Sequence, residues 1–275
     1  MADAVNLSSS VRSNLLTLQR STDLIALTQT RLSTGKVVNT AIDDAPAFFT
    51  AKALSNTAAD FELLKSEIDL AISTIQSAID GIDAITELVV QAKGLATNAK
   101  STGNTNERST LAVQFNELLS QINLIANDAT FNGSNLLKAT PDNLAVAFND
   151  DNTSNLTITG LDSTTASTGI NIAVAANNFG LNANIDTALT AISAALSELR
   201  SNAATMGSKN TILGTRLDFT ENLVANLNSG EGKLTLADLN EESAKLLALQ
   251  TRQQLGINSL ALAAQSERSI LALFG

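Results

Sequence analysis

One row of apolar residues constrains the fold of this chain more than any other feature. The row starts at Phe61 and runs without a break through Leu64, Ile68 and Ala71 to Ala96, in alternating steps of three and four residues. A 3.5-residue repeat of this length indicates one long helix that packs at a shallow angle against other helices. At 1.5 Å of rise per residue, this helix is about 50 Å long.

Two further rows repeat the same spacing. One runs from Leu111 to Ile125 and the other from Leu189 to Leu227, and a polar turn at residues 101–106 joins the first two helices. Three such helices can bury their apolar stripes against one another in one antiparallel bundle. We therefore predict a mainly α fold, with a long antiparallel helical bundle or coiled-coil rod over residues 44–140 and 186–235.

The sequence changes character between the second and third helices. Three short β-branched runs, LAVAF (144–148), LTITGL (156–161) and INIAVAA (170–176), are separated by the turn-like segments NDDNTSN and DSTTASTG. Short runs with partial alternation, bounded by such segments, are typical of strands. We predict that residues 141–185 form a small β-rich insertion, too short to hold much core of its own.

The two ends of the chain are helical but more apolar than a helix pair needs. At the amino end Val11, Leu15, Leu18, Thr22, Ile25, Gln29 and Leu32 keep the three-four spacing. At the carboxyl end, residues 255–264 and 270–274 are apolar on nearly every face. A helix that is apolar all round must be buried on all sides, and two paired helices cannot achieve this alone. Identical copies of the chain are the simplest source of the missing surface.

Composition excludes many functions. Among its 275 residues the chain has no His, Cys, Trp or Tyr, and its net charge is −10. The commonest general base, the soft metal ligands and the thiol nucleophile are therefore missing, and we expect no enzyme activity, metal or cofactor. The negative charge disfavours nucleic acid and anionic membranes as partners. The amino terminus does not resemble a cleaved signal peptide, and no apolar run reaches membrane-spanning length.

One stretch, RLSTGKVVNTAIDDAPAFF (31–49), resembles a reactive site at first sight. A phosphate-binding loop needs a glycine five residues before its Gly-Lys, and Thr30 stands there instead. The adjacent Asp43 and Asp44 supply too few ligands for a metal. The alternative is structural: Gly35 ends the first helix, an aspartate caps the next, and Pro46 lies in its first turn. We interpret the stretch as a joint.

Several short motifs recur in order near both ends of the chain. They are Leu32-Ser33-x-Gly35, Val38-Asn39, Asp43-Asp44-Ala45, Phe131-Asn132-Gly133, Leu136-Leu137, Glu242-Ser243-Ala244, Leu246-Leu247, Gln253-Gln254, Leu260-Ala261 and Ile270–Leu273. Any one of them is weak, but together they resemble the motifs of bacterial flagellins, the subunits of the flagellar filament. The resemblance covers about the first 140 and the last 90 residues, and it departs from the family at Pro46-Ala47, Gln265 and Phe274-Gly275.

The resemblance implies both an architecture and a function. Residues 1–43 and 236–275 would pair as an inner domain, the bundle would form the tube wall, and the insertion would point outward. The short connector containing Gly35, Asn39, Asp43, Asp44 and Pro46 would join the inner domain to the bundle and touch neighbouring subunits. The chain would be an extracellular structural subunit of a homopolymer that drives swimming.

The resemblance also implies partners. They are the flagellar type III export apparatus, a secretion chaperone, the filament cap and the hook-junction proteins. Export would occur without a cleaved signal peptide.

From the apolar ends we expect terminal helices that become ordered on polymerisation, because ordering a backbone costs more than these segments can offset alone. The side chains expected to dominate the polymerisation interface are Leu15, Leu18, Ile25, Leu32, Leu247, Leu255, Ile257, Leu260, Leu271 and Phe274. Two alternatives stay open, a hook-filament junction protein of the same family and a secreted helical adhesin or effector. Growth of long filaments separates both from a flagellin.

Overall fold

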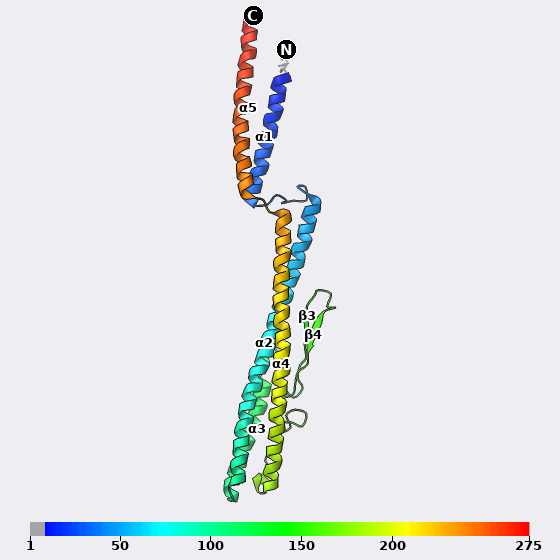
Figure 1. Ribbon diagram of the computed structural model, residues 1–275, viewed down its shortest axis with the longest axis vertical. Helices are drawn as coiled ribbons and strands as arrows, with labels where there is room; N and C mark the ends of the chain where they lie inside the picture. The colour runs from blue at the N-terminus through cyan, green and yellow to red at the C-terminus, as the bar shows by residue number, and fades with distance from the viewer. Residues whose placement is uncertain (1–8, 275) are drawn as a thin grey trace. The chain divides into compact units, whose positions relative to one another are not determined.

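The structure is a computed structural model that describes residues 9–274, without the side chains of residues 10, 267 and 270–274. Its helices are α1 (Ser9–Thr34), α2 (Ala45–Ser101), α3 (Thr105–Asp128), α4 (Asn182–Thr235) and α5 (Leu239–Phe274), as Figure 1 shows. The chain divides into two compact units. One unit contains the residues up to 57 and those from 226 onward, and the other contains residues 58–225. We call them the terminal unit and the bundle unit. The division into an inner domain (1–43 and 236–275), a bundle (44–140 and 186–235) and an insertion (141–185) stays a prediction.

The predicted apolar row of α2 forms the centre of the bundle unit. From Ile68 to Ala96 its members are buried, including Ile75, Ile82 and Val89, which expose 1% of their surface or less. The rows predicted for the other two helices face this core, and Phe115 of α3 and Leu199 of α4 are completely buried. The sequence-based prediction of a mainly helical bundle is therefore confirmed.

Two ion pairs fix the relative direction of α2 and α4. Lys65 Nζ lies 3.0 Å from Glu221 Oε1, and Lys100 pairs with Asp186. Each pair joins an earlier residue of one helix to a later residue of the other, so the two helices run antiparallel. The hydrogen bond from Lys65 to Glu221 and the attraction between their charges raise the pKa of Lys65.

Two small antiparallel hairpins follow α3. In the first, β1 (Thr130–Phe131) pairs with β2 (Ser134–Asn135) across Asn132-Gly133, whose φ angles are 48° and 81°. Two positive φ angles define the turn type that Asn-Gly favours in two-residue hairpins. In the second, β3 (Leu144–Ala147) pairs with β4 (Asn155–Ile158), and Leu144 lies opposite Ile158.

The third predicted strand, residues 170–176, does not form. Ile170 and Ile172 are buried, but their backbone N–H groups donate to Thr164 and Thr165 within the same loop. The backbone N–H of Ala175 donates to Asn116 Oδ1 of α3 at 2.8 Å. The alternation of this run therefore reflects packing against a helix, and the N–H groups of Ile170, Ile172 and Ala175 are satisfied without a neighbouring strand.

A strained turn, η1 (Ala176–Phe179), follows this loop. Asn177, Asn178 and Phe179 all have positive φ angles, between 47° and 57°. Asn tolerates this conformation, but a bulky aromatic residue rarely adopts it. Phe179 is completely buried and its ring meets the ring of Phe115 edge-on, with 5.2 Å between centroids. Burial of the ring offsets the backbone strain.

Candidate assembly interface

In the terminal unit α1 and α5 lie side by side and pack along a regular seam (Figure 1). On each helix the buried and half-buried residues recur in steps of three and four. From α1 the seam takes Val11, Asn14, Leu18, Ser21, Ile25, Thr28 and Leu32, and from α5 it takes Glu242, Leu246, Leu249, Gln253, Gly256, Leu260 and Ala263. This spacing is that of a two-helix coiled coil.

The seam is only partly apolar. Ser21 is buried and its hydroxyl donates to the carbonyl of Thr17 at 2.9 Å, while Gln253 Nε2 donates to Thr22 Oγ1 at 3.2 Å. Gly256 allows close approach, because a Cβ there would lie 2.9 Å from Leu18 Cδ1. A seam with this many small and polar residues buries less apolar surface than one made of leucine, so it holds the pair together weakly.

A charge cluster around the buried Glu242 lies at the end of the seam nearest the connector. Glu242 Oε1 lies 3.1 Å from Lys245 Nζ and 3.6 Å from Arg31 Nη1. Hydrogen bonds to Glu241 and then to Glu242 raise the pKa of Lys245. The second oxygen of Glu242 and the Nε of Arg31 are buried without a partner. Such an arrangement stabilises little after desolvation, but removing the two cations would leave the carboxylate of Glu242 buried without a countercharge.

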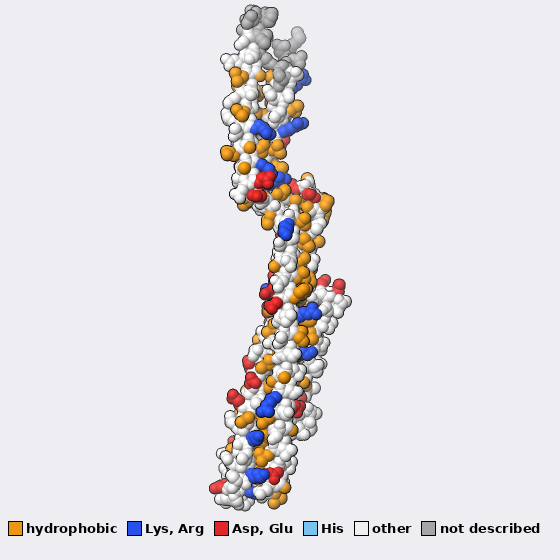
Figure 2. All heavy atoms as spheres, in the orientation of Figure 1, with side chains coloured by type: hydrophobic (Ala, Val, Ile, Leu, Met, Phe, Trp, Pro, Cys, Tyr) orange, Lys and Arg blue, Asp and Glu red, His pale blue; other side chains and the backbone are white. Residues whose placement is uncertain are grey.

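Many leucines of this unit point away from the seam into solvent. Leu247, Leu255 and Leu262 are 67%, 62% and 66% exposed, and Leu16 and Ile257 are also exposed. Figure 2 shows apolar side chains spread along the pair rather than gathered between its helices. Single exposed leucines are normal on a protein surface, but so many along one helix pair indicate a surface that another protein covers.

The predicted interface residues fall into three groups. Leu15, Leu247, Leu255 and Ile257 are exposed, whereas Leu18, Ile25, Leu32 and Leu260 are half-buried in the seam. The backbone of Leu271 and Phe274 continues α5, but their side chains lie outside the described residues. Sequence reasoning did not select four exposed leucines, namely Leu16, Leu24, Leu27 and Leu262. The first three lie off the apolar row, which is the signal that could have found them.

The connector is built from hydrogen bonds and shows no reactive groups. Gly35 has φ 69° and its N–H donates to the carbonyl of Arg31, which ends α1. Asp43 Oδ2 accepts from the N–H groups of Asn39 and Thr40 at 3.0 and 2.8 Å. The next residue, Asp44, caps α2 by accepting from Ala47 N, and Pro46 lies in the first turn of that helix. The carboxylates of Asp43 and Asp44 thus accept hydrogen bonds from backbone N–H groups.

Asp43 gives the connector a pH dependence. Hydrogen bonds from the backbone of Thr40 and Asn39, then from the Thr40 hydroxyl, lower its pKa below the ordinary value of 3.8. An acid with a lowered pKa contributes stability above its unfolded pKa and loses it as the pH falls through the folded value. At neutral pH, D43A should raise amide hydrogen exchange at Asn39 and Thr40 by about three- to ten-fold.

Hydrogen exchange followed by mass spectrometry checks this prediction. The unchanged protein should keep its protection at these amides down to pH values below 3.8 and lose it only in stronger acid. Equal exchange in D43A and the unchanged chain at pH 7 would show that the carboxylate does not hold the turn. D44A is the matched control, because it should affect the first turn of α2 instead.

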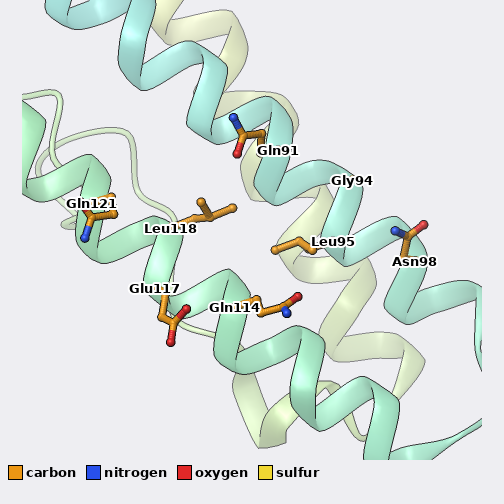
Figure 3. Close-up of a pocket in the computed structure, with 8 residues that line it drawn as sticks. All are labelled: Gln91, Gly94, Leu95, Asn98, Gln114, Glu117, Leu118 and Gln121. Carbon is orange, nitrogen blue, oxygen red and sulfur yellow. The ribbon is translucent and has the colours of Figure 1, made fainter.

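A hollow of about 630 Å³ lies between α2 and α3 in the bundle unit (Figure 3). Its lining residues are Gln91, Gly94, Leu95, Asn98, Gln114, Glu117, Leu118 and Gln121. Carboxamides and leucines do not ionise, and Glu117 is the one lining residue that does, so the lining offers no pair of nucleophile and base. Within residues 9–274 no group of acidic side chains is arranged to hold a metal, and none of the described helices could cross a membrane.

Comparison with known protein families decides the identity. Residues 5–142 match the bacterial flagellin N-terminal helical region, and residues 189–274 match the bacterial flagellin C-terminal helical region. The chain belongs to the bacterial flagellin family. As a flagellin it is a structural subunit of the extracellular flagellar filament and not an enzyme, and it self-assembles with copies of itself.

Relatives match this flagellin over nearly its whole length. Flagellin FljM of Caulobacter vibrioides is 34% identical over 273 residues, covering 99% of this chain and 98% of the relative. Flagellin FljK of the same organism is also 34% identical, with the same coverage. A flagellin of Brucella melitensis is 29% identical over 275 residues, covering 97% of each chain. These full-length matches do not favour an adhesin, an effector or a junction protein.

Proposed function

We propose that copies of this flagellin polymerise through the exposed apolar side chains of α1 and α5. The observation that carries the proposal is the exposure of Leu247, Leu255 and Leu262, each above 60%, on a helix already paired with another. Burying one leucine stabilises an assembly by about 1.5–3 kcal/mol, so a few such side chains can drive association. The proposed interface comprises the ten predicted residues together with Leu16, Leu24, Leu27 and Leu262.

We further propose that the terminal helices become fully ordered only when they dock. Holding one residue in a helix costs about 1–2 kcal/mol of backbone entropy, and the partly polar seam returns little of it. Docking onto a filament end would supply the apolar contacts that the seam lacks. Ordering and polymerisation would then be one coupled step.

The connector is proposed to transmit this docking to the bundle. Gly35 ends α1 and Asp44 caps the start of α2, so the intervening residues must link the two helices while keeping their backbone groups bonded. The N–H of Val37 donates to the carbonyl of Thr235, and the N–H of Ala237 donates to the carbonyl of Gly35. These two hydrogen bonds tie the chain segment that follows α1 to the segment that follows α4. Asn39, Asp43 and Pro46 complete the set that we assign to this role.

Export through the flagellar type III apparatus without a cleaved signal is likewise a proposal. The absence of cysteine supports it, because no disulfide can obstruct the threading of an unfolded chain. A secretion chaperone, the filament cap and the hook-junction proteins would then meet the subunit along its route. Recovery of filament subunits that retain the whole amino-terminal sequence would test the missing cleavage.

The interface is tested by changing two exposed leucines. L247S/L255S should raise the critical concentration for polymerisation by about ten-fold or more, since each serine removes roughly one buried leucine from the filament. The measurement is the amount of pelleted filament as a function of protein concentration after addition of ammonium sulfate. Sulfate promotes apolar burial, and its ions screen the repulsion between subunits of charge −10.

The matched control is L181S, because Leu181 is 59% exposed but belongs to the bundle unit. It should polymerise like the unchanged flagellin. If L247S/L255S also did so, the outer faces of α5 would not form the interface. If L247S/L255S and L181S both formed filaments as well as the unchanged flagellin, the polymerisation interface would have to lie on another surface.

A further inference from the structure

Two matching stripes of side chains, all of them exposed except the half-buried Lys209, lie on α2 and α4 within the bundle unit. We propose that the stripe on α2 of one subunit packs against the stripe on α4 of the next, forming a lateral contact between copies of this chain. The proposal rests on the filament role of the family. It is independent of the interface assigned to α1 and α5, because every residue involved belongs to residues 58–225.

The stripe on α2, which we call the acidic stripe, consists of Asp60, Leu63, Glu67 and Leu70. All four are exposed, and Leu63 and Leu70 expose 70% and 47% of their surface. They lie outside the apolar row of α2 that contains Leu64, Ile68 and Ala71, and they face solvent. The folded subunit therefore does not use them.

The stripe on α4, the basic stripe, consists of Lys209, Ile212, Arg216 and Phe219. Ile212 is 41% exposed and Phe219 is 59% exposed, although the same helix buries Leu213 and Thr220 in its seam. The Arg216 guanidinium lies 4.7 Å from the centre of the Phe148 ring, which holds that side chain beside the stripe. Ile212 and Phe219 are not members of the main apolar core of the subunit.

The two stripes match in spacing and are opposite in charge. Each has two apolar side chains seven residues apart, or about 10.5 Å along a helix. Each apolar residue is preceded by a charged residue three positions earlier, acidic on α2 and basic on α4. None of these four charged residues makes an ion pair in the described part of the chain. Two acidic stripes would repel, so the charges favour α2 against α4.

The direction of the helices also fits. A helical polymer relates its subunits by rotation and translation along one axis, so helices that run along this axis keep their direction from copy to copy. Since α2 and α4 are antiparallel within one chain, α2 of one copy meets α4 of the next antiparallel. When two helices pack antiparallel, residues on a given side of the contact in one helix lie next to residues on the same side of the contact in the other helix. The charged residues of both stripes lie on that same side of their apolar residues, so they meet.

This geometry sets a register. Leu63 lies against Phe219, Glu67 against Arg216, and Leu70 against Ile212 of the neighbouring subunit. The contact uses two different surfaces of one subunit, so it is heterologous and can repeat without closing into a dimer. It would supply the lateral cohesion of a tube wall from residues that the isolated fold leaves in solvent.

Reversal and exchange of one charge pair test the contact. E67K and R216E should each raise the critical concentration for polymerisation of the full chain by about five-fold or more, because each opposes like charges at every contact. The double variant E67K/R216E restores an opposite pair and should return to within about two-fold of the unchanged protein. D83K is the matched control, since Asp83 is an exposed acid on α2 outside the stripe.

Each outcome has a defined meaning. Failure of the double variant to recover would overturn the contact, as would stronger assembly by E67K, which would indicate α2 packing on α2. Thermal unfolding of each monomer identifies any loss of folding. R216E also removes the stacking on Phe148, but that loss cannot be repaired by a lysine at position 67, so recovery reports the contact itself.

Disulfide trapping gives a second readout. The chain has no cysteine, so L63C/F219C introduces the only two thiols. Oxidation of assembled filaments with an added oxidant should join them between copies and produce a ladder of covalent oligomers on a non-reducing gel. L63C/L124C, which places the second thiol on exposed Leu124 of α3, should give no ladder. Dimers alone, or no ladder from L63C/F219C, would contradict the heterologous contact.

Discussion

Removal of residues 239–275, a deletion that takes away α5, is expected to abolish filament growth while the bundle unit stays folded. The truncation deletes half of the seam and, with Leu247, Leu255 and Leu262, the most exposed leucines assigned to the polymerisation interface. The main apolar core loses nothing, because its buried members run from Ile68 to Leu213 and include no residue of α1 or α5. The truncated chain should therefore unfold cooperatively near the temperature of the full subunit, yet stay monomeric.

Electron microscopy measures filament growth, and circular dichroism measures the thermal unfolding of the truncated chain. After sulfate addition the full chain should show filaments and the truncated chain none, at protein concentrations at least about ten-fold above the critical concentration of the full chain. Addition of truncated subunits to growing filaments should leave them excluded from the pellet. Truncated chains that polymerise would mean that the bundle unit alone carries assembly, and loss of cooperative unfolding would mean that the bundle needs α5.

The long helices could be predicted from the sequence because their signal is local and repeated. The row from Ile68 to Ala96 is unbroken, and an error at one position would not change the interpretation of the others. The helix caps could be predicted from the sequence equally well. Gly35 and Asp44 bring backbone requirements that few other residues meet, and the structure places them at the end of α1 and the start of α2.

The row of α1 was predicted only in part. The seam uses Asn14, Ser21 and Thr28, whereas the prediction chose Leu15, Thr22 and Gln29 at the same spacing shifted by one residue. The two choices share Leu18, Ile25 and Leu32 and Val11, so periodicity alone cannot separate them, and apolarity favoured the wrong one at Leu15. The exposure of Leu15, Leu16, Leu24 and Leu27 contradicts the usual assumption that the most apolar face of a helix is the buried one.

The segment after the hairpins depended on contacts distant in sequence. The N–H of Thr165 donates to Asn123 Oδ1 of α3 at 2.9 Å, and Asn116 holds Ala175 in the same way. No pattern within the loop reveals that side chains of α3 will satisfy its backbone. The two stripes of the bundle unit were missed for a related reason, since each is recognised only when the seam of its own helix is known.

Replacing Phe179 by alanine should have the largest effect of any single substitution in the bundle unit. Its ring is fully buried against Phe115, and removal of a buried aromatic ring lowers the free energy of unfolding by about 3–5 kcal/mol. Alanine gives no relief from the backbone strain, because the residue still has a φ of 57°. The loss should therefore not be offset, and it would consume much of the stability of a typical domain.

Denaturant unfolding of monomeric F179A, compared with F219A, isolates the burial of the ring. Both variants make the same chemical change, but Phe219 is 59% exposed, so F219A should alter the free energy of unfolding by no more than about 0.5 kcal/mol. The same control variant should assemble poorly, because Phe219 belongs to the basic stripe. Equal destabilisation by the two changes would contradict the burial of Phe179. A strained backbone at Phe179 persists in the fold only because its ring completes the core between the loop and α3.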